Sequence, residues 1–478
     1  MRSQTRTGRR RLSRRIAAGL LPLALLQTGA STVAMAQATA PVVASAPLPA
    51  GLNPDLADDA PERAPGQKPV AKSLEAGIWA ETAKAELQAK TSGEREFSPE
   101  LDAYVNSVLA RVTGPYSGDV RLYVMDRPFF NASMAPNGYT EVWTGLLLRC
   151  QTEDELAFVL GHESGHFRHS HSVKTYQALK DGQTAALAAT VLLSVVAMGA
   201  AANASSVQAA QSISQATSGL IDIVYLGSVA AFLGYSRETE GQADSYGLIY
   251  MRQAGYYPGS APDVWRDRLD ETAASDFEKV RNSPARINVF GDHPLERDRL
   301  TSLIRQDKLL NSGAPSTRSE DQAKTARAAY RAHIRPFLST WLKDDLRRQD
   351  YGQTLFVVKK LGVDGQDMGV LNFYAGEAYR LRGQKGADGS DLENAVTAYK
   401  KALENPDAPK ETYRQLGDVF RRLNATKDAI DAFTAYLKAS PDAPDAWMVQ
   451  DQIDTLSKAA PPPPAAAPAT SVSGGTKT

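Results

Sequence analysis

The 478-residue sequence predicts a mainly α-helical (α+β) protein with one small β-sheet, followed by an α-helical solenoid of repeats. Two observations support this fold class. Apolar residues at helical spacing fill most of the chain, whereas strand-like alternation is confined to Val120–Val124 and a second candidate at Tyr139–Thr144. The last third of the chain repeats with a period of 34 residues, a length typical of stacked pairs of helices.

Composition limits the functions to consider. Charged residues make up 23% and hydrophobic residues 42% of the chain, as in a soluble globular protein of two or three domains. The formal charge is zero, but residues 1–36 hold seven arginines and no acid, which leaves 47 basic and 54 acidic residues and a net charge of −7. No basic stretch of this remainder suggests a nucleic-acid partner. The single Cys150 cannot form an intrachain disulfide.

The N-terminus has the pattern of a secretion signal. A basic stretch at Arg9–Arg15 precedes an apolar core at Ile16–Leu26 and an A-x-A site at Ala34–Ala36, so we expect cleavage after Ala36. An uncleaved membrane anchor is the alternative, and the short apolar core disfavours it. Arg14-Arg15 resembles a twin-arginine signal only weakly, so ordinary secretion is the preferred interpretation. Residues 37–72 are rich in Pro and Ala and are expected to form a flexible leader.

Capping residues and apolar spacing then predict a series of helices. Thr152 and Glu155 form a capping-box pattern that opens the most informative of them. The other helical stretches are Ser73–Lys90, Ser98–Val112, Ser236–Gly255 and 262–310, the last with a break at Asp292-His293-Pro294.

The Ala-, Ser- and Val-rich region 184–233 allows two interpretations. Its nearly uncharged part, Ala185–Ala202, reaches the 18 residues of a candidate transmembrane helix. However, Ala and Ser contribute little hydrophobicity and no basic flank lies nearby. We therefore favour helices that pack on the domain or make peripheral membrane contact, and membrane spanning remains the alternative.

The repeats can be tested by residue spacing. Small and aromatic positions recur 34 residues apart, and an earlier pair recurs 41 residues apart, which implies a seven-residue insertion around Gly383–Asp391. The 34-residue period predicts tetratricopeptide repeats over residues 317–456, with Trp341–Leu361 as a degenerate copy and a disordered tail at 457–478. The recurring residues are Ala395, Tyr399 and Ala402 with Ala429, Phe433 and Tyr436, and Gly376 and Tyr379 with Gly417 and Phe420.

The run His162-Glu163-Ser164-Gly165-His166 carries the chemistry. Because an α-helix turns once per 3.6 residues, His162 and His166 share one face and can bind a single zinc ion. Glu163 is then placed to take a proton from an attacking water during peptide-bond hydrolysis.

Catalytic zinc needs a third protein ligand. The candidates are His169, His171, His293 and the carboxylates of residues 236–244. His169 and His171 follow His166 closely, with no glycine to let the chain double back, so we interpret them as the charged end of the helix beside its negative dipole.

Glu240 is the preferred third ligand. Glu240 and Asp244 lie one turn apart on a second predicted helix, so a metal ligand and a helper can share a face. Asp244 could then accept the remaining ring N–H of a ligand histidine and fix its tautomer. Glu238 points elsewhere and is expected to be a solvated acid.

With these motifs the sequence resembles the HExxH/ExxAD gluzincin peptidases, a family that includes HtpX, Oma-type and BepA-like proteases. The resemblance covers roughly residues 75–310, and the helical repeats after it are most similar to BepA-like periplasmic enzymes. Its motifs are His162-Glu163-x-x-His166, Ser236-Arg237 before Glu240-x-x-Ala243-Asp244, Asn131-Ala132, Gly145-Leu146-Leu147, Ala254-Gly255-Tyr256, His293-Pro294 and Arg299.

The resemblance implies a zincin-like metallopeptidase domain at 73–312 and two further roles. His293 would lie near the metal, where it would either occupy the open position and keep the enzyme latent or stabilise the tetrahedral intermediate. The strand with Tyr139, Val142 and Thr144 would be the edge strand on which substrates lie.

These inferences predict a periplasmic zinc endopeptidase. Its substrates would be unfolded or misassembled outer-membrane proteins, and its repeats would recruit protein partners. One alternative is a chaperone or binding scaffold whose zinc site is latent. A membrane-embedded quality-control protease is the other.

Overall fold

The computed structural model describes residues 51–180, 235–282, 297–311, 319–386 and 390–459, all within one compact unit. The expected signal peptide, the region 184–233, His293 and nearly all of the expected tail lie outside the described residues. Among the described residues, no helix is both long and apolar enough to cross a membrane.

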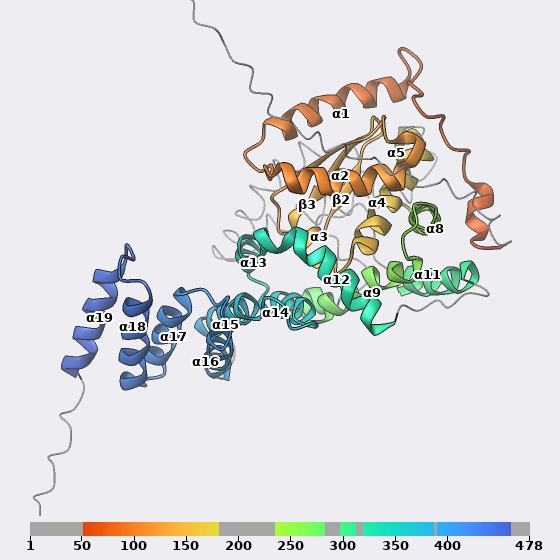
Figure 1. Cartoon of the computed structure of the whole chain (residues 1–478). Coiled ribbons are helices and arrows are strands. Elements are labelled where there is room, and N and C mark those ends of the chain that lie inside the picture. Colours follow the sequence, from red (N-terminus) through yellow and green to blue (C-terminus); the bar gives the residue numbers. More distant parts are fainter. Residues whose placement is uncertain (1–50, 181–234, 283–296, 312–318, 387–389, 460–478) are drawn as a thin grey trace, which may run out of the picture. The chain divides into compact units, whose positions relative to one another are not determined.

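The first two helices begin where their caps predict. The hydroxyl of Ser73 accepts a hydrogen bond from the N–H of Ala76 and starts α1 (Leu74–Thr91). Ser98 caps α2 (Pro99–Thr113) in the same way, and α2 packs on the sheet through a buried apolar face (Figure 1). Capping thus fixes where each helix starts, and apolar burial fixes which face of α2 turns inward.

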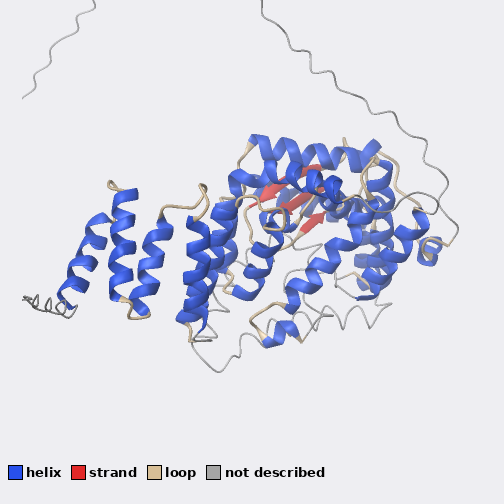
Figure 2. Ribbon diagram, turned by 60° about the horizontal axis from the view of Figure 1, so that its bottom comes forward, coloured by secondary structure: helices blue, strands red, loops and turns tan. Residues whose placement is uncertain are grey.

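A three-stranded sheet lies among the helices (Figure 2). It consists of β1 (Arg121–Met125), β2 (Ala132–Met134) and β3 (Tyr139–Trp143) in the order β1-β3-β2. β3 pairs parallel with β1 and antiparallel with β2. The expected edge strand at Tyr139–Thr144 is therefore wrong, because β3 is central and Thr144 is the first residue of α3 (Thr144–Arg149).

The open edge of the sheet is β2. The outer side of β1 is partly covered, since Glu96 donates its N–H to the carbonyl of Val124 and Asp126 donates to Glu94. No described segment pairs with the outer side of β2. A three-residue strand is too short to show a period-two pattern, so the sequence did not reveal it.

The two helices with the HExxH and ExxAD motifs cross at glycines. A Cβ atom on Gly161 of α4 (Glu153–Arg168) would lie 2.9 Å from the carbonyl oxygen of Gly247 of α8 (Arg237–Gln253). Larger residues would separate the two backbones. This close approach places the motif faces of α4 and α8 against each other.

The rest of the structure is helical. Two equivalent contacts support the internal repeat, since Gly376 packs on the ring of Tyr399 and Gly417 packs on the ring of Phe433. The remaining helices are α5 (His171–Lys180), α9 (Ala261–Ala273), α10 (Glu278–Arg281), α11 (Arg297–Leu310), α12 (Glu320–Ile334), α13 (Leu338–Arg347), α14 (Tyr351–Leu361), α15 (Met368–Gln384), α16 (Ser390–Leu403), α17 (Glu411–Arg422), α18 (Thr426–Ala439) and α19 (Ala446–Ala459).

The described part of the expected leader packs against other segments of the chain. Residues 51–72 include the 3₁₀ helix η1 (Pro54–Asp58), which lies beside α8 (Figure 1). Leu52 and Arg63 are buried, and Arg63 donates a hydrogen bond to the carbonyl of Pro136. Composition did not predict this packing because polar side chains, and not an apolar core, supply most of the anchoring contacts.

Candidate metal centre

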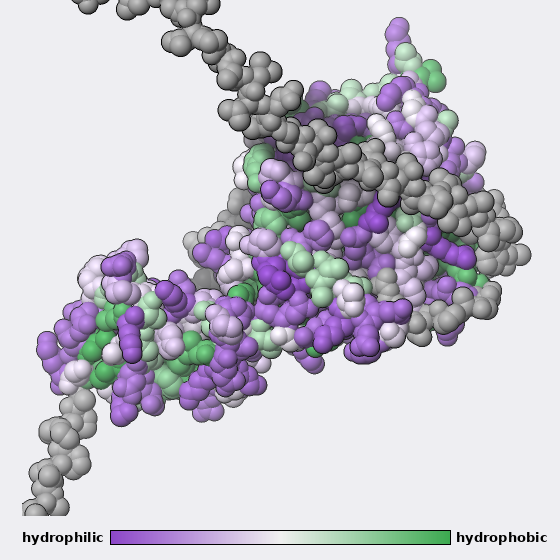
Figure 3. Space-filling view, viewed as in Figure 1, coloured by the Kyte–Doolittle hydropathy of each residue, from purple (hydrophilic) through white to green (hydrophobic). Residues whose placement is uncertain are grey.

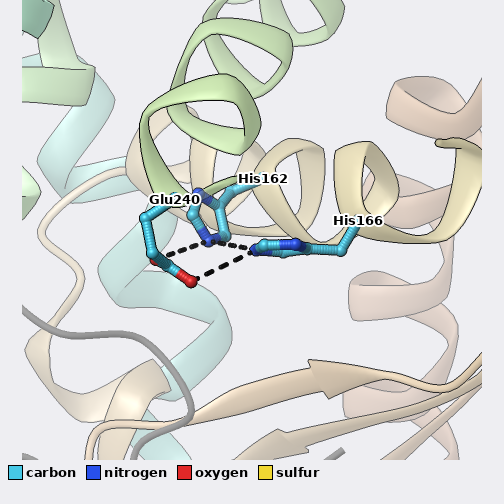
Figure 4. Close-up of side chains that lie close together, drawn as sticks. All are labelled: His162, His166 and Glu240. Atoms are coloured by element: carbon cyan, nitrogen blue, oxygen red, sulfur yellow. Dashed lines mark hydrogen bonds and ion pairs between the residues drawn. The ribbon is translucent and has the colours of Figure 1, made fainter. Parts of the chain in front are cut away.

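Three buried side chains converge as the motifs predict (Figure 4). The Nε2 atoms of His162 and His166 lie 3.1 Å apart. The two carboxylate oxygens of Glu240 lie 3.6 Å from these nitrogens, one from each. All three residues are at most 2% exposed.

This donor set fits a zinc ion. Ligand bonds of 2.0–2.2 Å in a tetrahedron place neighbouring donor atoms about 3.3 Å apart. The separations of 3.1 and 3.6 Å bracket that value. Two imidazoles and a carboxylate are also a ligand set that catalytic zinc uses, with a fourth position left for water or substrate.

The N-terminus of α4 is held almost as the capping-box pattern predicts. The hydroxyl of Thr152 accepts a hydrogen bond from the N–H of Glu155 at 3.3 Å. The Glu155 carboxyl bonds back to the N–H of Gln151, one residue earlier than in a standard capping box. Glu163 lies one residue after His162 on this helix and is buried.

Comparison with known proteins agrees with this geometry. Residues 97–306 match the model of peptidase family M48. These residues are thus similar to M48 peptidases. Zinc is the metal of this family, and the cluster of His162, His166 and Glu240 lies within the matched range.

Three relatives share part of the chain. A Vibrio cholerae serotype O1 protein that carries the provisional name beta-barrel assembly-enhancing protease is 28% identical over 211 residues, which cover 42% of this chain and 38% of the relative. The mitochondrial metalloendopeptidase OMA1 of Schizosaccharomyces pombe is 31% identical over 170 residues, 35% of this chain and 43% of the relative. OMA1 of Arabidopsis thaliana is 29% identical over 157 residues, 32% of this chain and 27% of the relative. The aligned part thus spans less than half the length of each relative.

Asp244 of α8 lies beside the candidate metal cluster. Its Oδ1 lies 3.1 Å from Nδ1 of His162, on the ring side opposite the metal-facing nitrogen. Burial opposes the charge of this carboxylate, but Arg299 and His162 outweigh that effect and hold the pKa of Asp244 well below its usual range. Asp244 is therefore an ionised acceptor for the ring N–H of His162.

Arg299 has a role that the sequence did not reveal. Its guanidinium donates two hydrogen bonds of 2.7 Å to Asp244 and forms an ion pair of 2.7 Å with Glu240. The indole N–H of Trp265 adds a hydrogen bond of 3.1 Å to Asp244. Arg299 thus fixes the relative placement of the expected third ligand and its helper, which lie 59 and 55 residues before it. Arg299 was visible in the sequence only as a family motif, and Trp265 gave no signal.

His169 is the C-cap residue of α4, at the helix end where it was expected, whereas His171 begins α5. Both are buried, and Nδ1 of His171 lies 3.0 Å from Nδ1 of His166. The chain doubles back without glycine because Ser170 adopts a left-handed conformation with φ of 56°. Residue type alone rarely predicts such a turn at serine.

Glu238 is the last carboxylate of residues 236–244 to place. Glu238 is exposed on α8, as expected for a solvated acid.

Proposed function

We propose that this chain is a zinc-dependent endopeptidase of the cell envelope that cleaves unfolded or misassembled proteins. The observation that carries the proposal is the buried cluster of His162, His166 and Glu240, with donor separations of 3.1 and 3.6 Å. These residues would hold zinc, which supplies the Lewis acidity that peptide hydrolysis needs. Glu163 would take a proton from the attacking water and pass it to the leaving amine nitrogen.

Removing the proposed base tests this mechanism. Glu163→Gln keeps the shape of the side chain but cannot accept the proton, so cleavage of a reduced and carboxymethylated protein should fall about 10²- to 10⁴-fold. The zinc content should stay at about one ion per chain. Glu238→Gln on the exposed face of α8 is the matched control. Proteolysis by Glu163→Gln at the wild-type rate would rule the mechanism out.

Substrate would lie along β2 and not along β3. In the antiparallel pairing of Ser133 with Glu141, the backbone groups of Ala132 and Met134 point to the open side of the sheet. An extended substrate could pair there as an added strand. Ala132→Pro deletes one outward N–H and should raise KM without changing zinc content. An unchanged KM would place the substrate elsewhere.

The helical repeats would recruit protein partners as a tetratricopeptide module. The glycine–aromatic contacts of Gly376 with Tyr399 and of Gly417 with Phe433 support this assignment. Apolar surface lies over the C-terminal helices (Figure 3), and Trp447 and Met448 of α19 are largely exposed. The region 1–36 supports secretion to the periplasm through its signal-peptide pattern.

The scaffold alternative predicts different genetics. If the zinc site were latent, Glu163→Gln would support envelope integrity in a deletion strain, whereas removal of residues 411–459 (α17–α19) would not. The peptidase proposal predicts that both variants fail. Release of the protein by alkaline extraction of membranes would exclude the membrane-embedded alternative.

A further inference from the structure

A segment before the matched residues 97–306 is hydrogen-bonded to both motif helices. Asn53 donates hydrogen bonds to the carbonyl of Gly241 and to the hydroxyl of Ser245 on α8, at 3.2 and 2.8 Å. The N–H of Arg63 donates to the carbonyl of Arg168 at the end of α4, at 2.8 Å. We call residues 52–63 the strap. Its course brings Asp59 to the turn between α4 and α5.

The carboxylate of Asp59 is buried among donors. Its side chain is 2% exposed, and its Oδ2 lies 3.0 Å from Nε2 of His171 and 3.0 Å from the hydroxyl of Tyr246. Its Oδ1 accepts from the N–H of Ala60 at 2.7 Å and pairs with the ammonium of Lys174. Oδ2 also lies 3.2 Å from Nδ1 of His169. One oxygen thus faces His171 and His169, and the other faces groups that can only donate.

Asp59 connects to the metal cluster through one ring. Nε2 of His166 faces His162 and Glu240, so a proton on the neutral His166 ring resides on Nδ1 when Nε2 binds a metal. That proton needs an acceptor, and Nδ1 of His171 lies 3.0 Å away. His171 can accept there only if its own proton is on Nε2. The carboxylate of Asp59, which lies 3.0 Å from Nε2 of His171, stabilises the tautomer with the proton on Nε2.

We propose that Asp59 is a positioning residue of the metal centre, which acts through His171 to orient His166. The order of donors runs from His166 Nδ1–H to His171 and from His171 Nε2–H to Asp59. This relay is the counterpart of the direct contact between Asp244 and His162, with one ring interposed. The inference rests on the proposed function only in taking His166 as a zinc ligand.

Asp59→Asn is a sharp test because the surroundings decide how its amide lies. Ala60 N–H and Lys174 can only donate, so the amide oxygen must take the Oδ1 position. The amide NH₂ then faces Nε2 of His171 and donates to it. Because His171 then accepts at Nε2, its proton must lie on Nδ1, where it faces the Nδ1–H of His166 and the two donors repel each other. The variant keeps the shape of the strap and reverses the tautomer.

The measurement is the zinc dissociation constant of the full chain, obtained by competition with a chromogenic chelator. Asp59→Asn should raise it about 10- to 100-fold, the usual effect of losing a hydrogen-bond partner of a ligand. Glu62→Gln is the matched control, since Glu62 anchors the same strap to Tyr250, Tyr116 and Arg168 but does not contact His171. Its dissociation constant should change less than about twofold, on the same estimate.

A second variant covers the case in which Asp59→Asn does not fold. His171→Phe keeps an aromatic ring in place but removes the acceptor, and should weaken zinc binding to a similar extent. Wild-type zinc affinity in either folded variant would overturn the proposal and leave Asp59 as an anchor of the strap. Failure of the proposed function would look different, because the wild-type chain itself would then bind no zinc or would bind zinc without cleaving protein.

Discussion

Glu155 is an acid kept neutral by its surroundings. It lies buried at the start of α4, where burial and the nearby Asp267 and Asp263 raise its pKa to about 8, against the N–H of Gln151 and the ammonium of Lys360. Its unfolded pKa is near 4.3. Between these values the folded chain binds a proton that the unfolded chain lacks. The contribution of Glu155 to stability is therefore present at low pH and is lost as the pH rises toward 8.

We expect Glu155→Gln to remove this pH dependence. The amide oxygen can still accept from the N–H of Gln151, so the cap is preserved. The free energy of unfolding of the variant, relative to wild type, should rise by at most about 1.4 kcal/mol per pH unit between about pH 5 and pH 8. Urea midpoints at pH 5 and pH 8 measure it. Parallel pH profiles for both proteins would contradict the prediction.

At the residue scale, the side chains of the metal cluster could be predicted from the sequence, but the residues that hold them in place could not. His162, His166, Glu240 and Asp244 follow from spacing within single helices, because the 3.6-residue turn fixes which residues share a face. The backbone conformation of Ser170 and the contact of Arg299 depend on tertiary structure, which no local pattern encodes.

At the scale of elements, the crossing of α4 and α8 depends on glycine. A Cβ atom on Gly247 would lie 2.9 Å from the backbone nitrogen of His162. Gly247→Ala should therefore push α8 away from α4, destabilise the fold by about 1 to 3 kcal/mol and lower zinc occupancy. Thermal unfolding and metal analysis measure both effects.

Gly77 in α1 provides the control for this prediction. No atom lies within 4 Å of a Cβ placed there, so Gly77→Ala should stabilise the helix by up to about 1 kcal/mol through its higher helix propensity. If Gly247→Ala were as harmless as Gly77→Ala, the close crossing would not be needed to form the site.

Helices were easier to predict than strand order. Ser73, Ser98, Thr152 and Ser236 each cap a helix at the position that the sequence indicates. The sheet order depends on pairing between segments, and the short β2 gave no pattern, so the edge was assigned to the wrong strand. Helix capping depends on neighbouring residues and can be predicted from sequence, whereas the pairing of distant strands cannot.

At the scale of the whole molecule, a buried ion cluster joins the region that matches family M48 to the helices that follow. Arg149 of α3 pairs with Glu271 of α9 at 2.9 Å and with Asp345 of α13 at 2.6 Å. Arg348 pairs with Asp345 at 2.8 Å. One hydrophobic core also includes residues from Leu52 to Ala432. Residues on both sides of the proposed boundary near 312–317 thus share this core, and the boundary stays a prediction.

Removing Arg149 should destabilise both parts of this core. Arg149→Met leaves the buried carboxylates of Glu271 and Asp345 with less compensation, and breaking such a pair costs about 3 to 5 kcal/mol. We expect a lower denaturant midpoint. Lys427→Met on α18 is the control, since Lys427 and its partner Asp431 are both exposed. Equal midpoints for the two variants would show that the cluster does not stabilise the fold.

The contacts of the strap with distant segments could not be predicted from its composition. Residues 51–72 have the composition of a leader, yet Asn53, Asp59 and Arg63 bind backbone and side-chain groups from four other segments. These contacts become visible only once α4, α5 and α8 have folded together.

The central claim is that His162, His166 and Glu240 hold one zinc ion. Anomalous diffraction on both sides of the zinc absorption edge, from crystals of the purified protein, tests it most directly. We expect a single peak about 2.0 to 2.2 Å from Nε2 of both histidines and from a carboxylate oxygen of Glu240. An active protein whose only zinc peak lies away from these three side chains would contradict it.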